Sequence, residues 1–196
     1  MIELKRKTKE TEITLTLKES SPSALNKRMD ARLFVDDQLG FFEHMLKALT
    51  YYAHLEMNLS CSGDVWVDTH HTMEDVGIVL GQAVKQLVML KSGYDRFGTA
   101  YVPMDEALVR TVIDISGRPF CHIEGLDTSN LPESEQALFE FIRAFSQHAG
   151  VTMHIDIIRG KNRHHIYEAM FKSIGQALRS GMKEQEDVIS TKGCLT

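Results

Sequence analysis

The chain opens on a stretch in which apolar and polar residues alternate. The segment ITLTLK at residues 13–18 has a period of two, which places the apolar side chains on one face of an extended strand. We therefore expect residues 2–18 to form a half-buried strand preceded by a shorter one, and ARLFVDD at 31–37 to form another strand.

Residues 41–93 show a helical period in two segments, separated by a stretch typical of strands. FFEHMLKALTYYAHL at 41–55 has the apolar spacing of a helix, and MNLSCSGDVWVD at 57–68 reads as strand, turn and strand. A long helical pattern then covers 70–90, with Thr69 as its expected cap and Gly93 as its expected end.

The second half of the chain follows the same plan. Residues 100–116 predict a pair of strands, 134–149 predict a helix, 151–160 predict a strand and 164–182 predict a second long helix. Residues 116–119, SGRP, are typical of a turn.

Sequence similarity between the halves supports an internal duplication. HMLKAL at 44–49 parallels EFIRAF at 140–145, and IVLGQAV at 78–84 parallels KSIGQAL at 172–178. A period near 95 residues is too long for a solenoid. We therefore predict an α+β fold of two duplicated halves, each a mostly antiparallel sheet with helices on one face, comprising residues 1–93 and 94–196.

The duplication includes a motif that carries metal chemistry. Residues 70–74 read HHTME and residues 164–168 read HHIYE. At a helix start, positions i and i+4 share a face, so the first histidine of each copy pairs with the glutamate and the second points roughly 100° away. One such turn is usually a solvated polar face, but two copies at duplicated positions favour ligands for divalent transition metals. Each turn could serve two ions.

Composition narrows the class of protein. The 196 residues are 43% hydrophobic and 25% charged, which is ordinary for a globular protein. A net charge of -5 argues against a nucleic-acid surface. No apolar run is long enough to span a membrane, and the first residues show no signal region. Three widely spaced cysteines suggest no disulfide framework, so a reducing cytoplasm is expected.

With these motifs identified, the chain resembles the imidazoleglycerol-phosphate dehydratases of histidine biosynthesis over nearly its whole length. The resemblance rests on stretches that occur in the family's order, namely RKTKETEI at 6–13, GFFEHML at 40–46, DTHHTMEDVGIVLGQA at 68–83, RFGTAYVPMDEAL at 96–108, DISGRP at 114–119, GKNRHHIYEAMFK at 160–172 and STKG at 190–193. It implies two four-stranded halves, each with two helices (a ribosomal protein S5 domain 2-like fold). It also implies a homo-oligomer of 24 chains, with active sites between chains that each hold two Mn²⁺ ions.

The family's reaction converts D-erythro-imidazoleglycerol phosphate into imidazole-acetol phosphate by loss of water. The substrate has no carbonyl beside the C–H bond that breaks, so a simple base would produce an unstable carbanion. Two metals on the two ring nitrogens would hold the ring as imidazolate, which can expel the neighbouring hydroxyl to give a diazafulvene-like intermediate. A base then removes the proton from the adjacent carbon.

The resemblance also implies roles for individual residues. One metal would take His44, His71, His164 and Glu168, and the other would take His70, Glu74, Glu140 and His165. Position 140 is usually histidine in the family, and His154 is a nearby competitor for this role, although its place in a strand favours a structural one. Glu10 and Glu106 are the expected catalytic acid/base residues, with Asp105 a further candidate and Glu10 also touching substrate. The expected phosphate-binding residues are Arg96, Arg118, Lys172, Ser190 and Lys192.

The chain also departs from the family pattern. The loop at 19–39 is longer than usual and lacks glycines, Ala48 replaces a frequent glutamine, and Tyr52 stands where histidine is usual, with His54 two residues on. These changes affect the expected wall of the substrate pocket.

Two other classes of function remain open from the sequence. A binuclear metallohydrolase would release inorganic phosphate, although such sites favour aspartates over histidines. A non-catalytic metal-binding shell protein would need no phosphate pocket, so it would not depend on Arg96 or Arg118.

Overall fold

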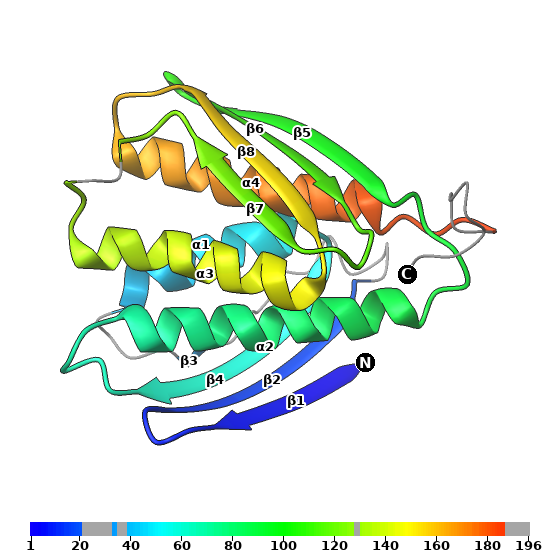
Figure 1. Ribbon diagram of the computed structural model, residues 1–196, viewed down its shortest axis with the longest axis horizontal. Coiled ribbons are helices and arrows are strands. Elements are labelled where there is room, and N and C mark those ends of the chain that lie inside the picture. The colour runs from blue at the N-terminus through cyan, green and yellow to red at the C-terminus, as the bar shows by residue number, and fades with distance from the viewer. Residues whose placement is uncertain (21–32, 35–38, 128–129, 187–196) are drawn as a thin grey trace.

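The two halves of the chain have the same order of elements. A computed structural model describes residues 1–20, 33–34, 39–127 and 130–186 (Figure 1). The first half contains β1 (Ile2–Lys7), β2 (Thr11–Glu19), β3 (Leu33–Phe34), α1 (Gly40–Tyr52), β4 (Leu55–Gly63) and α2 (His70–Met89). The second half contains β5 (Phe97–Met104), β6 (Ala107–Asp114), β7 (Phe120–Glu124), α3 (Glu133–Ala149), β8 (Thr152–Arg159) and α4 (Arg163–Gly181).

Each half folds into a four-stranded sheet. The strand orders are β1-β2-β4-β3 and β5-β6-β8-β7, so the two sheets have the same topology. In each sheet two pairs of strands are antiparallel, while β3 runs parallel to β4 and β7 parallel to β8. The predicted α+β fold of mostly antiparallel duplicated halves is confirmed.

The helices lie between the two sheets and pack across the halves. Figure 1 shows the four helices as an inner layer, with α2 beside α3 and α1 beside α4, and these pairs are in contact. Gly81 and Gly175, from the repeated GQA motif, allow this close approach. A Cβ at Gly81 would lie 2.6 Å from the Phe145 carbonyl oxygen of α3, and one at Gly175 would collide with the Leu49 carbonyl of α1. The inner faces of both sheets and the helices share one continuous apolar core.

Several local predictions were wrong. After Gly63 the chain makes a turn, in which the Val67 N–H donates to the Asp64 carbonyl at 2.8 Å, and no second strand forms between residues 64 and 68. Strand β7 was not predicted because all its side chains are at least partly exposed, which leaves no apolar alternation to detect. Helix α2 ends at Met89, before the expected Gly93.

The starts of α2 and α4 are stabilised in the same way. The Thr69 side chain makes no capping hydrogen bond, contrary to the sequence prediction. Instead the Asp68 carboxylate accepts the His70 N–H at 2.8 Å, and the Asn162 side chain accepts the His164 N–H at 2.9 Å. Each histidine doublet therefore begins at a helix start whose first N–H groups are fixed by a side chain two residues earlier.

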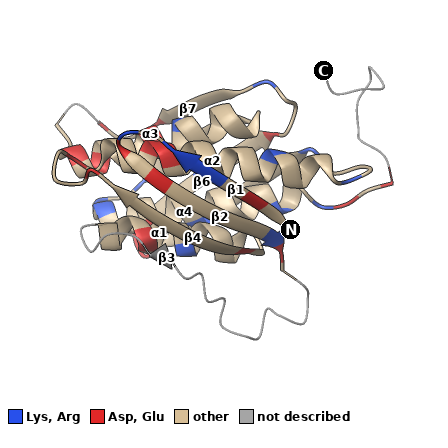
Figure 2. Cartoon of the chain, turned by 90° about the horizontal axis from the view of Figure 1, so that it is seen from below, with Lys and Arg blue, Asp and Glu red and all other residues tan. Residues whose placement is uncertain are grey.

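Charge is concentrated at the edge of the first sheet. The outer strand β1 carries four charged residues in the segment IELKRK, and Figure 2 shows these acidic and basic segments beside the largely uncharged β2 and β4. Charged side chains on an edge strand disfavour pairing with strands of other molecules. No helix in the described ranges is both long and apolar enough to cross a membrane.

Candidate metal centre

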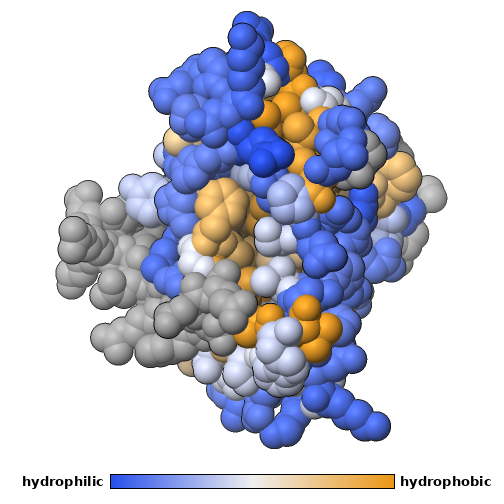
Figure 3. Space-filling model, turned by 90° about the vertical axis from the view of Figure 1, so that its left-hand side faces the viewer, coloured by the Kyte–Doolittle hydropathy of each residue, from blue (hydrophilic) through white to orange (hydrophobic). Residues whose placement is uncertain are grey.

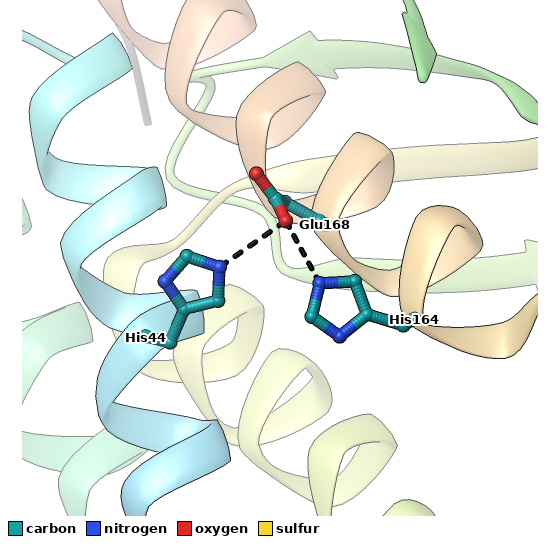
Figure 4. A group of neighbouring side chains, drawn as sticks. All are labelled: His44, His164 and Glu168. Atoms are coloured by element: carbon teal, nitrogen blue, oxygen red, sulfur yellow. Dashed lines mark hydrogen bonds and ion pairs between the residues drawn. The ribbon is translucent and has the colours of Figure 1, made fainter. Parts of the chain in front are cut away.

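One group of metal-ligating side chains is already assembled within the chain. His44 comes from α1, whereas His164 and Glu168 lie one turn apart on α4 (Figure 4). The Nε2 atoms of both histidines lie 3.1 Å from the same Glu168 oxygen, Oε2, and the two rings stack with centroids 5.9 Å apart. The packing of α1 against α4 therefore brings two nitrogens and one oxygen together.

The carboxylate of Glu168 is kept ionised by its surroundings. Burial alone would raise its pKa, but hydrogen bonds from Lys172 and His44 outweigh burial and lower the pKa to about 2. Lys172 donates to the other oxygen, Oε1, at 2.7 Å. Oε2 is thus an anionic donor beside two imidazoles, a set suited to Mn, Fe, Ni or Zn. This cluster brings together three of the four residues expected for one metal.

A second group surrounds His71, the fourth expected member of that set. Its Nδ1 lies 3.1 Å from Asp64 Oδ2 and 3.9 Å from Glu10 Oε2. The hydrogen bond with Asp64 is the main reason that the pKa of His71 is raised. Within the described ranges, this group and the His44 cluster are the two sets of three donor side chains close enough to share an ion.

His165 occupies the corresponding place in the second half. Its Nδ1 lies 2.7 Å from Glu106 Oε2, in the turn between β5 and β6, and its Nε2 lies 3.6 Å from Asp105. Glu106 Oε1 accepts the Asn162 N–H at 2.7 Å and the Lys161 N–H at 3.0 Å. These bonds, that of Asn162 first, lower the pKa of Glu106 to about 2, and the bond with Glu106 raises the pKa of His165.

The remaining expected ligands are not gathered into one site. His70 Nε2 lies 3.5 Å from Glu74 Oε2 on α2, but the Glu140 carboxylate on α3 pairs with Arg143. The full four-residue sets implied by the resemblance are therefore not assembled in a single chain. His154 lies on the outer face of the second sheet beside His122, with ring centroids 6.0 Å apart, and the helices cover the opposite face.

The expected phosphate-binding arginines lie together at the other end of the second sheet. Arg96 Nε and Nη2 donate to the two Asp114 oxygens at 2.6 and 3.0 Å, and Arg118 lies 3.9 Å from the same carboxylate. Strand β6 has eight residues and runs from beside Glu106 to Asp114, a distance of about 25 Å in an extended strand. Ser190 and Lys192 lie outside the described residues.

Known proteins are similar to this chain in both sequence and fold. Residues 38–178 match the sequence model of a family described as imidazoleglycerol-phosphate dehydratase. The chain belongs to the imidazoleglycerol-phosphate dehydratase family. It is 43% identical to the dehydratase of Desulfotalea psychrophila, covering 98% of this chain and 94% of that protein, and 42% identical to that of a Sulfurovum species, covering 100% of both.

Solved structures of this dehydratase family agree. The crystal structure of the Pyrococcus furiosus dehydratase in complex with (S)-C348 matches with a TM-score of 0.81 and 34% identity, covering 98% of this chain and 100% of that one. The Staphylococcus aureus dehydratase gives a TM-score of 0.77 and 32% identity, over 93% and 98% of the two chains. The chain is accordingly a carbon–oxygen lyase of the hydro-lyase class.

Two of the departures from the dehydratase pattern lie beside the His44 cluster. Ala48 and Tyr52 line a hollow of about 360 Å³ whose wall also includes His44, Glu168 and Lys172. The Lys172 ammonium lies 5.7 Å from the centre of the Tyr52 ring, close enough for a cation–π contact. His54 lies elsewhere, after the end of α1. Most of the 19–39 loop lies outside the described residues.

Asp64 is a candidate site residue that sequence reasoning missed. Asp64 is 8% exposed and contacts His71, and its Oδ1 has no hydrogen-bond partner among the described residues. A buried carboxylate with an unpaired oxygen is costly unless positive charge is nearby, which fits a metal bound to the adjacent imidazole. In the sequence, the available signal was that Asp64 is an acidic residue shortly before the histidine doublet at 70–71.

Proposed function

We propose that this chain removes water from D-erythro-imidazoleglycerol phosphate to give imidazole-acetol phosphate, with two Mn²⁺ ions per active site, as a step of histidine biosynthesis in the cytoplasm. The observation that carries the proposal is the assembled set of His44, His164 and Glu168 in a chain of the dehydratase family. The residues fit a divalent cation because two imidazole nitrogens converge on one ionised oxygen.

Each ion would be held by four side chains. One set is His44, His71, His164 and Glu168, and the other is His70, Glu74, Glu140 and His165. Bound in this way, the two ions would supply Lewis-acid stabilisation of the substrate's imidazole ring as an imidazolate. For Glu140 to serve as a ligand, its carboxylate would have to exchange its contact with Arg143 for the cation.

Proton transfer falls to Glu10 in this proposal. Its side chain is 54% exposed in the turn between β1 and β2, and it approaches His71 without a direct hydrogen bond. In the reaction, one carbon loses its hydroxyl and the adjacent carbon loses its proton to the base. The proton and the hydroxyl leave together as water, and the resulting enol becomes the ketone of the product. Glu106 was the second residue expected in this role.

The active sites would form between chains of a homo-oligomer of 24 subunits. Two features support shared sites. The metal sets are incomplete within one chain, and the Arg96–Arg118 pair lies about 25 Å along β6 from the turn that holds Glu106. The substrate, an imidazole ring joined to a phosphate by three carbons, is far shorter than this distance. It cannot reach both the arginine pair and the Glu106 turn of one chain, so a neighbouring chain would supply the arginines.

The phosphate end of the substrate would be bound by Arg96 and Arg118, with Ser190 and Lys192 completing the site. In the structure Arg96 and Arg118 are drawn together by Asp114. Lys172, the other expected phosphate ligand, lies in the wall of the hollow beside Glu168.

A product assay combined with metal analysis tests the proposal. Purified protein should contain Mn²⁺, have a native mass of many subunits, and convert the substrate with loss of water. Release of inorganic phosphate instead would identify a metallohydrolase. Metal binding without turnover, unaffected by Arg96→Ala and Arg118→Ala, would identify a non-catalytic binding protein.

A further inference from the structure

The two histidines of each doublet are held through different ring atoms. The first histidines, His70 and His164, direct Nε2 toward the glutamate of their own turn, at 3.5 and 3.1 Å. The second histidines contact a carboxylate through Nδ1, with His71 3.1 Å from Asp64 and His165 2.7 Å from Glu106. The same arrangement occurs in both halves, although the two carboxylates come from different loops.

These contacts fix the protonation of the second histidines. An ionised carboxylate can only accept a hydrogen bond, so Nδ1 of His71 and His165 must carry the proton. In a neutral ring, Nε2 then has the free lone pair. The Asn162 amide lies 3.5 Å from His165 Nε2, on the side where an acceptor is expected.

We infer that Asp64 and Glu106 are positioning residues, which hold His71 and His165 with Nε2 directed to a metal ion. The inference rests on the proposed function, because it takes both histidines as Mn²⁺ ligands. Outer carboxylates of this kind orient a ligating imidazole and raise its basicity.

Both carboxylates are held in place by contacts other than those with the histidines. Asp64 follows β4 and is nearly buried, so it cannot turn away into solvent. Glu106 lies between β5 and β6 and is tied by its second oxygen to the Lys161 and Asn162 N–H groups, just before α4. The direction of each histidine ring is therefore set by a carboxylate that lies outside its own helix.

Glu10 and Glu106 occupy matching turns, between β1 and β2 and between β5 and β6, but have different roles in this proposal. Glu106 is engaged through both oxygens, whereas Glu10 lies 3.9 Å from His71, beyond hydrogen-bond distance, because Asp64 takes that position. Glu10 is thus left for proton transfer, while Glu106 acts through His165. This replaces the sequence expectation that Glu106 moves a proton.

Manganese titration of three variants tests the inference. Glu106→Gln and Asp64→Asn keep the shape and an accepting oxygen for the neighbouring N–H groups but remove the charge. Glu124→Gln is the matched control, since Glu124 lies 3.6 Å from His122 on the exposed face of β7. Mn²⁺ affinity, read by electron paramagnetic resonance of free Mn²⁺, should fall about 10- to 100-fold at one of the two sites in the first two variants and stay unchanged in the control.

The outcomes are distinguishable. Wild-type Mn²⁺ affinity in both Glu106→Gln and Asp64→Asn would overturn the inference, and lost turnover with unchanged affinity in Glu106→Gln would return that residue to proton transfer. If one variant fails to fold, the other tests the same claim in the opposite half. Failure of the wild-type protein to bind Mn²⁺ at all would instead refute the proposed function.

Discussion

Two corners of the molecule are built from equivalent positions, one between α1 and α4 and the other between α3 and α2. They differ in whether the side chains that could bind a metal are already close together. In the first corner, His44 joins His164 and Glu168 at 3.1 Å. In the second, the residue equivalent to His44 is Glu140, which pairs with Arg143 and leaves His70 and Glu74 alone. The duplicated backbone thus supplies two similar frames, one around His44 and one around Glu140. They differ in the residue at this position, and among the described residues the donor side chains are gathered only in the first.

Some of the exposed apolar surface lies at the end of the molecule that carries both corners. Figure 3 views the side where α2, α3 and α4 begin and shows apolar side chains running between hydrophilic ones. Phe41 is 39% exposed there and contacts the His164 ring, with centroids 5.4 Å apart. An apolar surface beside an incomplete metal site is consistent with a site completed by another chain.

Replacing one doublet histidine in each frame should have the largest effect. His164→Ala and His70→Ala should each reduce kcat/KM more than about 100-fold, beyond the loss expected for an outer-shell partner, because a direct ligand is removed. Both should also lower the native mass measured by light scattering. Normal turnover by either variant would show that its frame holds no catalytic metal.

Metal removal should affect both frames together. Dialysis against EDTA should abolish turnover, and adding Mn²⁺ at 100 times its dissociation constant should restore it and stabilise the fold by about 2.7 kcal/mol for each ion bound. Thermal unfolding with and without Mn²⁺ measures this effect, with Mg²⁺ as the control cation. Full activity in the chelated sample would refute the proposed chemistry.

Position 140 tests the difference between the frames directly. Glu140→Ala should weaken Mn²⁺ binding at one site by at least about tenfold, since one ligand is lost. Glu140→His should keep turnover, because imidazole is an equally suitable ligand and makes the frame equivalent to that of His44. Isothermal titration with Mn²⁺ compares the variants, and Glu133→Ala at the start of α3 is a control. Unchanged binding in Glu140→Ala would exclude this residue from the metal.

The helix contacts of the two frames should be equally sensitive to added volume. Gly81→Ala and Gly175→Ala should each lower the free energy of unfolding by about 1–3 kcal/mol, because the new methyl group meets a carbonyl of the facing helix. Gly40→Ala is the control, since nothing lies within 4 Å of its added Cβ. Urea unfolding in EDTA measures the difference. Wild-type stability of both variants would contradict the close packing.

Lowering the pH should have the smallest effect of these tests, a loss of the stability that ionised Glu168 contributes to the His44 cluster. The pKa of Glu168 is lowered from 4.5 to about 2, so its ionised form stabilises the fold above about pH 4.5, and this contribution is lost as the pH falls toward 2. The stability difference between wild type and Glu168→Gln, measured by urea unfolding in EDTA, should therefore shrink over this range. If the stability difference between wild type and Glu168→Gln grew as the pH fell, the contacts of Glu168 with Lys172 and His44 would be contradicted.

The period of the apolar residues and the similarity between the halves were sufficient to predict the duplicated fold. The first is a local property of each segment, and the second is visible as repeated sequence motifs. They could not predict β7, whose exposed residues carry no apolar pattern, or the turn after Gly63, where the Asp64 carbonyl closes a loop. The two HHxxE turns predicted six of the expected ligands, whereas His44 and Glu140 and the grouping into two sets came from the family resemblance. The role of Asp64 depends on a contact with His71 that spacing alone does not reveal.

The pairing of α1 with α4 and of α2 with α3 has a consequence for the origin of this chain. A precursor of half the present length would have had two helices with no covering partner from within itself. Association with an identical copy, helix layer against helix layer, would have covered these helices. Fusion of two such genes would have freed the copies to diverge, and the matching positions now hold different residues, His44 and Glu140.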